Sequence, residues 1–269
     1  MRVVTWNLLH GIALTQGESK PGLAEIAGQI SADIIGLQEV DRNQPRSDYE
    51  HQTELVAKSM GLPHWIFAPA IVGTPGESWE GADDSHIHTH DHLPNSQTQP
   101  HYGVGLASRY PMTNVEVLRF KAAPLSLPLL FPGNPRPRII KVADEPRLAI
   151  IANLETPVGI ITVATAHLSF VPGYNVKQIR TLSKHLTTRN NPVLIIGDFN
   201  LPGQISGRVT GWDSLAKIPT YPTLKPRIQF DHMLARGFGA ESVKLAKASA
   251  HTLALEISDH CALVVEVSV

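Results

Sequence analysis

Pro192-Val193-Leu194-Ile195-Ile196-Gly197-Asp198-Phe199-Asn200 is the stretch of sequence that decides the fold. Residues 192–196 are apolar on both faces, as expected of a strand buried between two layers of structure. A carboxylate and an amide follow at once, where the strand ends and a turn begins. Buried strands that end in polar side chains are typical of layered α/β folds, which build their clefts at strand ends.

Short β-branched runs of the same kind recur along the whole chain, and each predicts a strand. Several are apolar on both faces, which again favours strands covered on two sides. The predicted strands are residues 2–6, 33–37, 103–107, 115–120, 138–142, 147–154, 159–164, 192–196, 228–234 and 262–267.

Amphipathic patterns between these runs predict three helices, the first with Ser19 as its N-cap and Pro21 near its first turn. Strands outnumber helices, and the helices are interspersed among them, so we predict an α/β (α+β) layered fold and not an all-β sandwich. No repeat or linker divides the chain, which predicts a single domain over residues 1–269. The apolar helical positions are Leu23, Ile26, Ala27 and Ile30, then Leu55, Val56 and Met60, then Val176, Ile179, Leu182 and Leu186.

Two stretches depart from the pattern and are predicted to be long loops, which in a compact domain are usually functional or mobile. Residues 73–101 are polar and rich in Gly, Asp and His, and residues 122–137 are rich in proline. In an extended chain the alternating histidines of the first loop would point to one side. A solvated loop, an accessory metal site and a lid over the substrate all remain open for these histidines, which are His86, His88, His90 and His92.

Carboxylates, amides and imidazoles stand at the ends of the predicted strands, far apart in the sequence, and one carboxylate, Asp231, falls inside the predicted strand 228–234. Most offer hard oxygen atoms, which suit Mg²⁺ or Mn²⁺ better than a tetrahedral zinc site. Two histidines beside such a metal are natural partners for phosphate oxygens. These candidate site residues are Asn7, Glu39, His167, Asp198, Asn200, Asp231, Asp259 and His260.

Seven runs in this order resemble the endonuclease/exonuclease/phosphatase family over nearly the whole chain. Each run alone is a weak signal, because three-residue matches occur by chance, but their common order is strong evidence. The runs are Thr5-Trp6-Asn7, Gly36-Leu37-Gln38-Glu39, Gly103-Val104-Gly105-Leu106-Ala107-Ser108-Arg109-Tyr110-Pro111, Thr165-Ala166-His167-Leu168, Gly197-Asp198-Phe199-Asn200, Phe230-Asp231-His232-Met233-Leu234 and Ser258-Asp259-His260.

The resemblance implies a deoxyribonuclease I-like fold, a four-layer sandwich of two facing mixed β-sheets flanked by helices, and hydrolysis of a phosphoester with a divalent metal. It implies that Glu39 is the main metal ligand, with Asn7 and Asp259 near it. It implies that Asp198 orients or deprotonates the attacking water and that Asn200 holds the nucleophile or a phosphate oxygen. His260, with the Asp231 carboxylate behind it, and His167 are implied to face the phosphate.

Elementary chemistry agrees with these roles. A phosphodiester is anionic, so charge on its oxygens must be neutralised as the transition state forms. Water is a poor nucleophile, so a carboxylate must take or orient its proton. A histidine paired with Asp231 would have its charged form favoured and could donate to the phosphate near neutral pH.

The composition of the chain indicates which kinds of binding partner are expected. The chain has 269 residues, 23 Lys plus Arg, 24 Asp plus Glu and a formal net charge of −1. It lacks the basic excess usual in proteins that bind nucleic acid. The single cysteine, Cys261, allows no intrachain disulfide, and no apolar stretch is long enough for a signal peptide or a membrane span. We therefore expect a cytoplasmic protein that acts on a phosphate ester, with no partner protein indicated.

Three functions remain in view at this point. The first is a phosphodiesterase or phosphatase acting on a small or lipid-derived phosphate ester, and the second is a nuclease. His167 departs from the abasic-endonuclease subgroup, which usually has a tyrosine there, and so favours the first. The third is an inactive binding module, which is disfavoured because every polar position of the motifs is filled. Arg109 and Arg147 are left without an assigned role, and Cys261 is read as a small buried filler.

Overall fold

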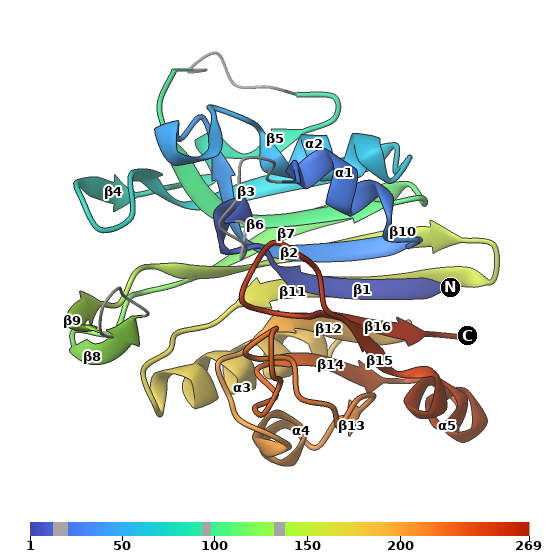
Figure 1. The fold of residues 1–269 in the computed structure, drawn as a ribbon. Coiled ribbons are helices and arrows are strands. Elements are labelled where there is room, and N and C mark those ends of the chain that lie inside the picture. The colour runs from blue at the N-terminus through green and yellow to red at the C-terminus, as the bar shows by residue number, and fades with distance from the viewer. Residues whose placement is uncertain (13–20, 93–97, 132–137, 269) are drawn as a thin grey trace.

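Two mixed β-sheets face each other in the computed structural model, which describes residues 1–12, 21–92, 98–131 and 138–268 (Figure 1). The first has eight strands, in the order β15-β16-β1-β2-β6-β3-β4 with β5 beside β3. They are β1 (Arg2–Asn7), β2 (Ile34–Arg42), β3 (His64–Gly73), β4 (Trp79–Gly81), β5 (His88–Thr89), β6 (His101–Ser108), β15 (His251–Leu253) and β16 (Ala262–Glu266).

The second sheet has six strands, in the order β13-β14-β12-β11-β10-β7. Each sheet holds one parallel pair, β1 with β2 and β11 with β12, among antiparallel neighbours. The strands are β7 (Met112–Phe120), β10 (Arg147–Thr156), β11 (Gly159–His167), β12 (Val193–Asp198), β13 (Asp213–Ser214) and β14 (Asp231–Arg236).

Helices cover the outer faces of both sheets (Figure 1). α1 (Leu23–Gly28) and α2 (Gln52–Ser59) pack on the first sheet, and α3 (Tyr174–Leu186) and α4 (Ile205–Thr210) pack on the second. α5 (Ala240–Ser249) lies beside β16. The predicted four-layer sandwich is confirmed. No described helix is long and apolar enough to cross a membrane.

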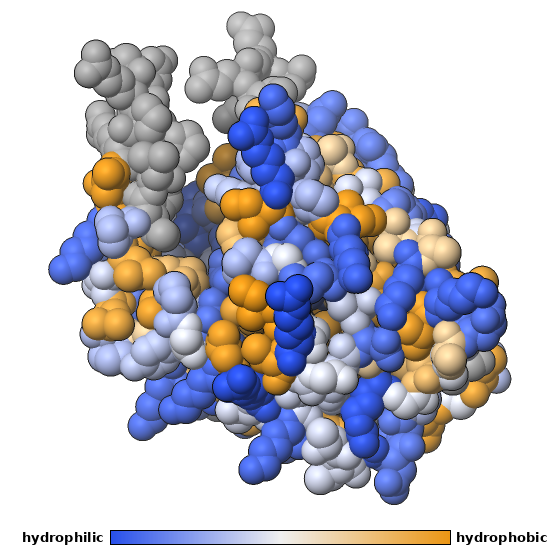
Figure 2. Space-filling model, turned by 90° about the horizontal axis from the view of Figure 1, so that it is seen from below, coloured by the Kyte–Doolittle hydropathy of each residue, from blue (hydrophilic) through white to orange (hydrophobic). Residues whose placement is uncertain are grey.

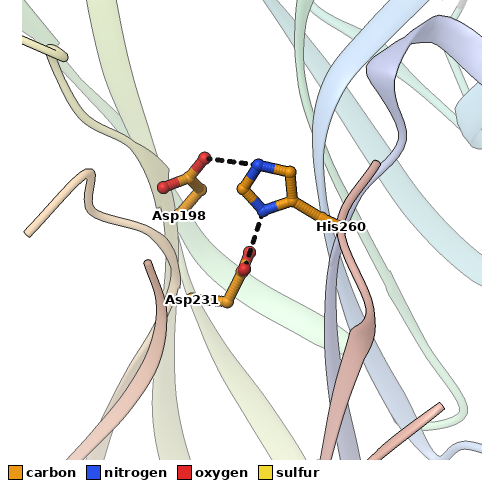
Figure 3. Close-up of side chains that lie close together, drawn as sticks. All are labelled: Asp198, Asp231 and His260. Atoms are coloured by element: carbon orange, nitrogen blue, oxygen red, sulfur yellow. Dashed lines mark hydrogen bonds and ion pairs between the residues drawn. The ribbon is translucent and has the colours of Figure 1, made fainter. Parts of the chain in front are cut away.

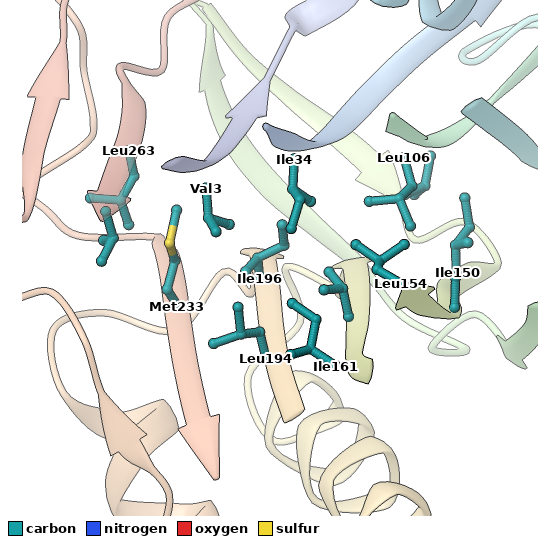
Figure 4. Packing of buried hydrophobic residues seen from close by; sticks show 14 of the residues in the cluster. Val3, Ile34, Leu106, Ile150, Leu154, Ile161, Leu194, Ile196, Met233 and Leu263 are labelled. Carbon is teal, nitrogen blue, oxygen red and sulfur yellow. The ribbon is translucent and has the colours of Figure 1, made fainter. Parts of the chain in front are cut away.

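The main core lies between the sheets (Figure 4). Val3, Ile34 and Leu106 from the first sheet are completely buried, as are Leu194 and Ile196 from the second. Each such side chain contributes about 1.5–3 kcal/mol when removed from water. A polar bridge crosses the same interface, since Gln38 Nε2 donates to Thr165 Oγ1 at 3.0 Å. Apolar burial and this hydrogen bond together fix the position of one sheet relative to the other.

The face of the molecule drawn in Figure 2 mixes hydrophilic and hydrophobic residues. In that view hydrophilic side chains are dispersed between small apolar groups.

Both loop predictions are wrong in part. Residues 73–101 contain β4, β5 and a 3₁₀ turn, η3 (Asp84–His86), so the four alternating histidines do not lie along one extended chain. In 122–137, β8 (Ser126–Phe131) pairs with β9 (Arg138–Ala143) in a two-stranded sheet. Pro128 is tolerated because an edge strand can lack one N–H donor. Residues 132–137 lie outside the described residues.

The sequence patterns also missed β3, the short strands β13 and β15, and the helices α4 and α5. β3 carries Pro69, which weakens a strand prediction, and the pairing with β6 shifts register between Pro69 and Ile71. α4 and α5 are short helices without a marked apolar stripe. The N-cap of α1 is Gly22, whereas the predicted cap, Ser19, lies outside the described residues.

Candidate active site

Strand register brings three predicted residues side by side in the second sheet. His167 is paired with Asp198 across β11 and β12, and Asp198 is paired with Asp231 across β12 and β14. All three side chains are buried. Each of these neighbouring strands carries one polar residue at the same register position. Strand pairing alone therefore brings the three side chains together.

The first sheet contributes Asn7 and Glu39 to the same place. Asn7 Nδ2 donates to Glu39 Oε1 and to Asp198 Oδ2, both at 3.0 Å. The Asn7 oxygen, Oδ1, accepts from the backbone N–H of Leu9 at 3.0 Å. In this arrangement Asn7 orients two carboxylates from facing sheets and does not present an oxygen beside Glu39.

A β-bulge aims Glu39. Its φ of 55° is in the left-handed region, and the pairing of β2 with β6 shifts register between Leu37 and Val40. A bulge of this kind re-aims a side chain that regular pleating would send elsewhere. The Glu39 side chain keeps 21% of its surface accessible, so it can meet a ligand.

His260 lies between two carboxylates (Figure 3). Its Nδ1 donates to Asp231 Oδ2 at 2.8 Å, and its Nε2 lies 3.9 Å from Asp198 Oδ2. Burial lowers the pKa of His260, but the carboxylates of Asp231, Asp198 and Asp259 outweigh it and raise that pKa to about 10. The imidazole is therefore held as a cation at neutral pH, with one N–H facing the site.

The pKa of Asp198 is raised well above that of an ordinary aspartate. Burial is the largest cause that raises its pKa, the Asp231 carboxylate adds to it and the His260 cation opposes it, which leaves the pKa at about 7. Its Oδ1 accepts the Asn200 N–H at 2.9 Å. Gly197 is required just before it, because φ is 142° and a Cβ there would lie 2.0 Å from the Ala166 carbonyl oxygen.

His167 and Asn200 complete the second-sheet side of the site. Asn200 Nδ2 lies 3.4 Å from His167 Nε2, which is itself 3.8 Å from both Glu39 Oε1 and Asp198 Oδ2. Burial, then the Arg147 cation, holds the pKa of His167 well below its usual value. His167 is thus a neutral ring that can donate or accept one hydrogen bond.

Asp259 lies half-buried next to His260. Burial raises the pKa of Asp259, the His260 cation opposes this, and the nearby Glu39 carboxylate adds to the rise. Glu39 and Asp259 are therefore two carboxylates with mutual repulsion. The Oδ1 atom of Asp231 is also buried without a hydrogen-bond partner among the described residues. Half-buried, mutually repelling oxygen ligands fit a hard divalent cation, which would neutralise them.

In the described part of the chain, one group brings three potential ligand atoms within 4.8 Å of one another, namely Asp198, Asp231 and His260. A cationic imidazole has no lone pair to give to a metal. We therefore interpret this trio as an ion-pair network, and Glu39 with Asp259 as the better cation ligands.

Two residues that contact the site, Arg147 and Tyr221, belong to none of the sequence motifs, and Ser258 begins the last motif without having been assigned a role. Arg147 Nη1 lies 3.2 Å from His167 Nδ1, and its Nη2 donates to Asp144 Oδ1 at 3.1 Å. The ring of Tyr221 packs 5.0 Å from that of His260. Ser258 Oγ accepts the His260 N–H at 3.0 Å. Arg147 starts a predicted strand, which is the one signal that could have drawn attention to it. Tyr221 and Ser258 lie in irregular segments.

The model of the endonuclease/exonuclease/phosphatase family matches residues 4–260. The chain belongs to this family. The endonuclease/exonuclease/phosphatase family comprises phosphoester hydrolases, which agrees with the chemistry of the side chains gathered here. A search of curated proteins found no match.

Solved structures share the fold of this family member at low sequence identity. A family protein from Beutenbergia cavernae is 18% identical, with a TM-score of 0.59 over 98% of this chain and 70% of that one. A mannosyl-6-phosphatase from Bacteroides thetaiotaomicron is 12% identical, with a TM-score of 0.55 over 100% of both chains. Sphingomyelinase C from Streptomyces griseocarneus is 15% identical, with a TM-score of 0.56 over 99% of both chains.

Proposed function

We propose that this chain is a divalent-metal-dependent hydrolase of a small or lipid-derived phosphate ester. The observation that carries the proposal is the contact of Asn7 with both Glu39 and Asp198, at 3.0 Å each, because it joins the two sheets at one polar site. Family membership supplies the reaction class.

Asp198 is the proposed base. With its pKa raised to about 7, it is ionised in a large fraction of molecules at neutral pH and yet basic enough to take a proton from water. Asn7 holds one of its oxygens and the Asn200 N–H holds the other. The carboxylate is therefore fixed in direction before the substrate arrives.

His260 and His167 are the proposed hydrogen-bond donors to the substrate phosphate. The cationic His260, kept in place by Asp231, offers its Nε2–H to a phosphoryl oxygen as negative charge develops. The neutral His167 offers a single N–H, and Arg147 behind it adds positive charge without its own side chain being exposed. Asn200 orients the water or a further phosphate oxygen through its amide.

Glu39 and Asp259 are the residues proposed to hold Mg²⁺ or Mn²⁺. When bound, such an ion neutralises phosphoryl charge and lowers the pKa of water. The choice of metal rests on their oxygen chemistry, since carboxylates prefer hard cations.

The β8–β9 hairpin favours a substrate with an apolar part. Its base is fixed to the site, because the Ala123 N–H donates to Asp144 Oδ2 at 2.8 Å and Asp144 binds Arg147. Ile139 is 74% exposed, and Ile140 on the same strand is also exposed. Among the fold relatives, one is named a sphingomyelinase and another a mannosyl-6-phosphatase, so lipid and sugar phosphates are the two first classes to compare.

The test is a hydrolysis screen with Mg²⁺ or Mn²⁺ and an EDTA control. Substrates are a generic phosphomonoester, a generic phosphodiester, a choline phospholipid in mixed micelles, plasmid DNA and single-stranded RNA. We expect metal-dependent turnover of a monoester or of a small or lipid diester, and loss of it in Glu39→Gln. Full activity in EDTA would refute the metal, and inactivity on every ester would refute the proposal.

The nuclease is the second candidate, since the family includes such enzymes. A nuclease that tracks a backbone neutralises several phosphates, so its affinity falls with salt at a log–log slope of about −0.9 per contact on duplex DNA. The net charge of −1 provides no general basic excess for this. Efficient plasmid cleavage with a steep salt dependence would favour the nuclease.

A further inference from the structure

Four histidines form a second cluster, separate from the candidate active site. This histidine cluster consists of His51 at the start of α2, His86 in η3, His88 in β5 and His101 in β6. Ring centroids are 5.4 Å apart for His51 and His88, and 5.8 Å for both His88–His101 and His101–His86. Two imidazoles on one tetrahedral ion, with metal–nitrogen bonds of about 2.0–2.1 Å, have ring centres roughly 5 Å apart.

Four buried ring nitrogens of this cluster have no hydrogen-bond partner among the described residues. His88 and His101 are completely buried. Within the described ranges, neither nitrogen of His88 has a hydrogen-bond partner, and Nε2 of His51 and Nε2 of His101 have none either. A buried polar atom left unpaired is destabilising and therefore rare. Four such atoms in one cluster indicate a ligand that the imidazoles share.

The protonation states suit a metal ion. Burial, followed by the Arg42 cation, lowers the pKa of His51 to about 4, that of His88 to about 3 and that of His101 to about 4. Neutral rings have one lone pair each to donate. The ring of His101 also reaches the Gln99 carbonyl, and that of His51 its own backbone carbonyl. In the structure, however, His51 Nδ1 accepts the Glu54 N–H at 3.4 Å and His101 Nδ1 lies 3.2 Å from the donor Arg42 Nη1. Metal binding through Nε2 therefore requires that these two contacts are replaced by hydrogen bonds from Nδ1–H to the two carbonyls.

His86 has the orientation of an additional ligand. Its Nδ1 lies 2.9 Å from Asp83 Oδ1, and a carboxylate behind one ring nitrogen is the usual way to fix a metal-binding histidine. His90 is different, because it is paired with His64 at 3.3 Å and with Asp91 at 3.0 Å. The alternating histidines of the sequence are therefore divided between two places.

We propose that His51, His88 and His101, with His86 as the fourth ligand, bind one divalent transition-metal ion of the Zn²⁺ class. All-imidazole ligation selects Zn²⁺, Ni²⁺ or Cu²⁺ over Mg²⁺, so this site differs in chemistry from the oxygen-rich active site. The ligand nitrogens do not all lie within 4.8 Å of one another in the described structure, so binding includes a rotation of imidazole side chains.

The ion would attach a long connection to the sheet. His86 and His88 belong to the segment between β4 and β6, whereas His51 begins α2 and His101 begins β6. One ion on four side chains would join η3 and β5 to the start of α2 and to β6. The role we infer is structural, because four protein ligands leave no open position for a substrate.

The first experiment measures Zn²⁺ binding to the full chain after EDTA treatment, by calorimetry and by metal analysis, in millimolar Mg²⁺ that occupies the oxygen-rich site. We expect one Zn²⁺ per chain. His88→Phe and His101→Phe each remove a ligand while filling its volume, and we expect each to weaken binding at least about 100-fold. His185→Ala, on α3 and outside the cluster, is the matched control and should bind like the parent.

Co²⁺ provides a readout that needs no variant. Tetrahedral Co²⁺ with nitrogen ligands has intense visible absorption, whereas six-coordinate oxygen sites absorb weakly. Intense absorption that is displaced by Zn²⁺ supports the site. Absence of both Zn²⁺ binding and this absorption in the folded parent chain overturns the proposal, as does unchanged Zn²⁺ affinity in a folded His88→Phe variant.

Discussion

Asp198 is the single side chain on which the proposed chemistry depends most. Asp198→Asn keeps the shape and the contact to Asn200 but removes the base. We expect kcat to fall by about 10²–10⁴, the usual value of general acid–base catalysis. Steady-state kinetics with the preferred ester measures this, and Asp213→Asn on the surface is the control. If kcat stays within a few-fold of the parent value, Asp198 is not the general base.

Asp231 and His260 should act as one unit, because Nδ1 of His260 and Oδ2 of Asp231 are 2.8 Å apart. Removing either partner disables the other, so Asp231→Asn and His260→Ala are each expected to lower turnover strongly. The double variant should lose much less than the sum of the two losses in activation free energy. A double-mutant cycle on kcat/KM tests this, and strict additivity would contradict the pairing.

Residue types at strand ends are enough to predict which side chains come to the site, but not how they are aimed. Asn7 and Asp198 directly follow apolar runs, so their place could be expected. Asp231 lies inside the predicted strand 228–234, whereas in the structure it begins β14. The positive φ of Glu39 depends on a bulge against β6, which no local pattern encodes. The Arg147–His167 contact joins two strands that are neighbours only in the folded sheet.

At the scale of elements, the turn that follows β12 is the most constrained. A Cβ on Gly197 would lie 2.0 Å from the backbone oxygen of Ala166 in the neighbouring strand. Gly197→Ala should therefore lower the free energy of unfolding by about 2–4 kcal/mol, because backbone must move. Urea denaturation followed by circular dichroism measures the loss.

Gly203→Ala is the matched control for this turn. Gly203 also has a positive φ, 61°, but its Cβ would meet nothing within 4 Å. Gly203→Ala should lower the free energy of unfolding by about 1 kcal/mol, because only the positive φ, and no steric clash, opposes an alanine there. Equal losses in the two variants would show that the close approach to β11 is not what requires glycine at 197.

Elements were predictable where one physical pattern dominated. The buried runs that became β1, β12 and β16 are apolar on both faces, and α3 has a clear apolar stripe. β3 was missed because Pro69 interrupts it, and β8 because prolines outweighed its apolar residues. In both cases partner strands supply hydrogen bonds that a single segment does not reveal.

At the scale of the whole molecule, the unusual feature is the number of buried neutral histidines. Burial lowers the pKa of His10 and His88 to about 3, and that of His51, His101 and His232 to about 4. The unfolded chain binds these protons near pH 6.5. Stability from these groups is therefore complete above pH 6.5 and is lost progressively as the pH falls towards 4.

Asp198 acts in the opposite direction, because its pKa in the folded protein, about 7, lies above that of an unfolded Asp. Burial also raises the pKa of Asp41, Glu145 and Asp259, so these carboxyls act in the same direction as Asp198. Together they offset only part of the effect of the five histidines. We expect the free energy of unfolding in EDTA to fall by a few kcal/mol per pH unit between pH 6 and 4.5, since each excess proton contributes about 1.4 kcal/mol per unit. Denaturant titrations at several pH values measure this slope.

His88→Phe is the informative variant for this slope, because it removes one buried histidine whose ring nitrogens have no partners in the described structure. Its slope should be shallower by about one proton, or ~1.4 kcal/mol per pH unit. His92→Ala, whose ring is exposed, should leave the slope unchanged. A parent chain equally stable at pH 7 and pH 4.5 would mean that the buried imidazoles take up protons in the folded state, and the histidine cluster would then have to open without unfolding.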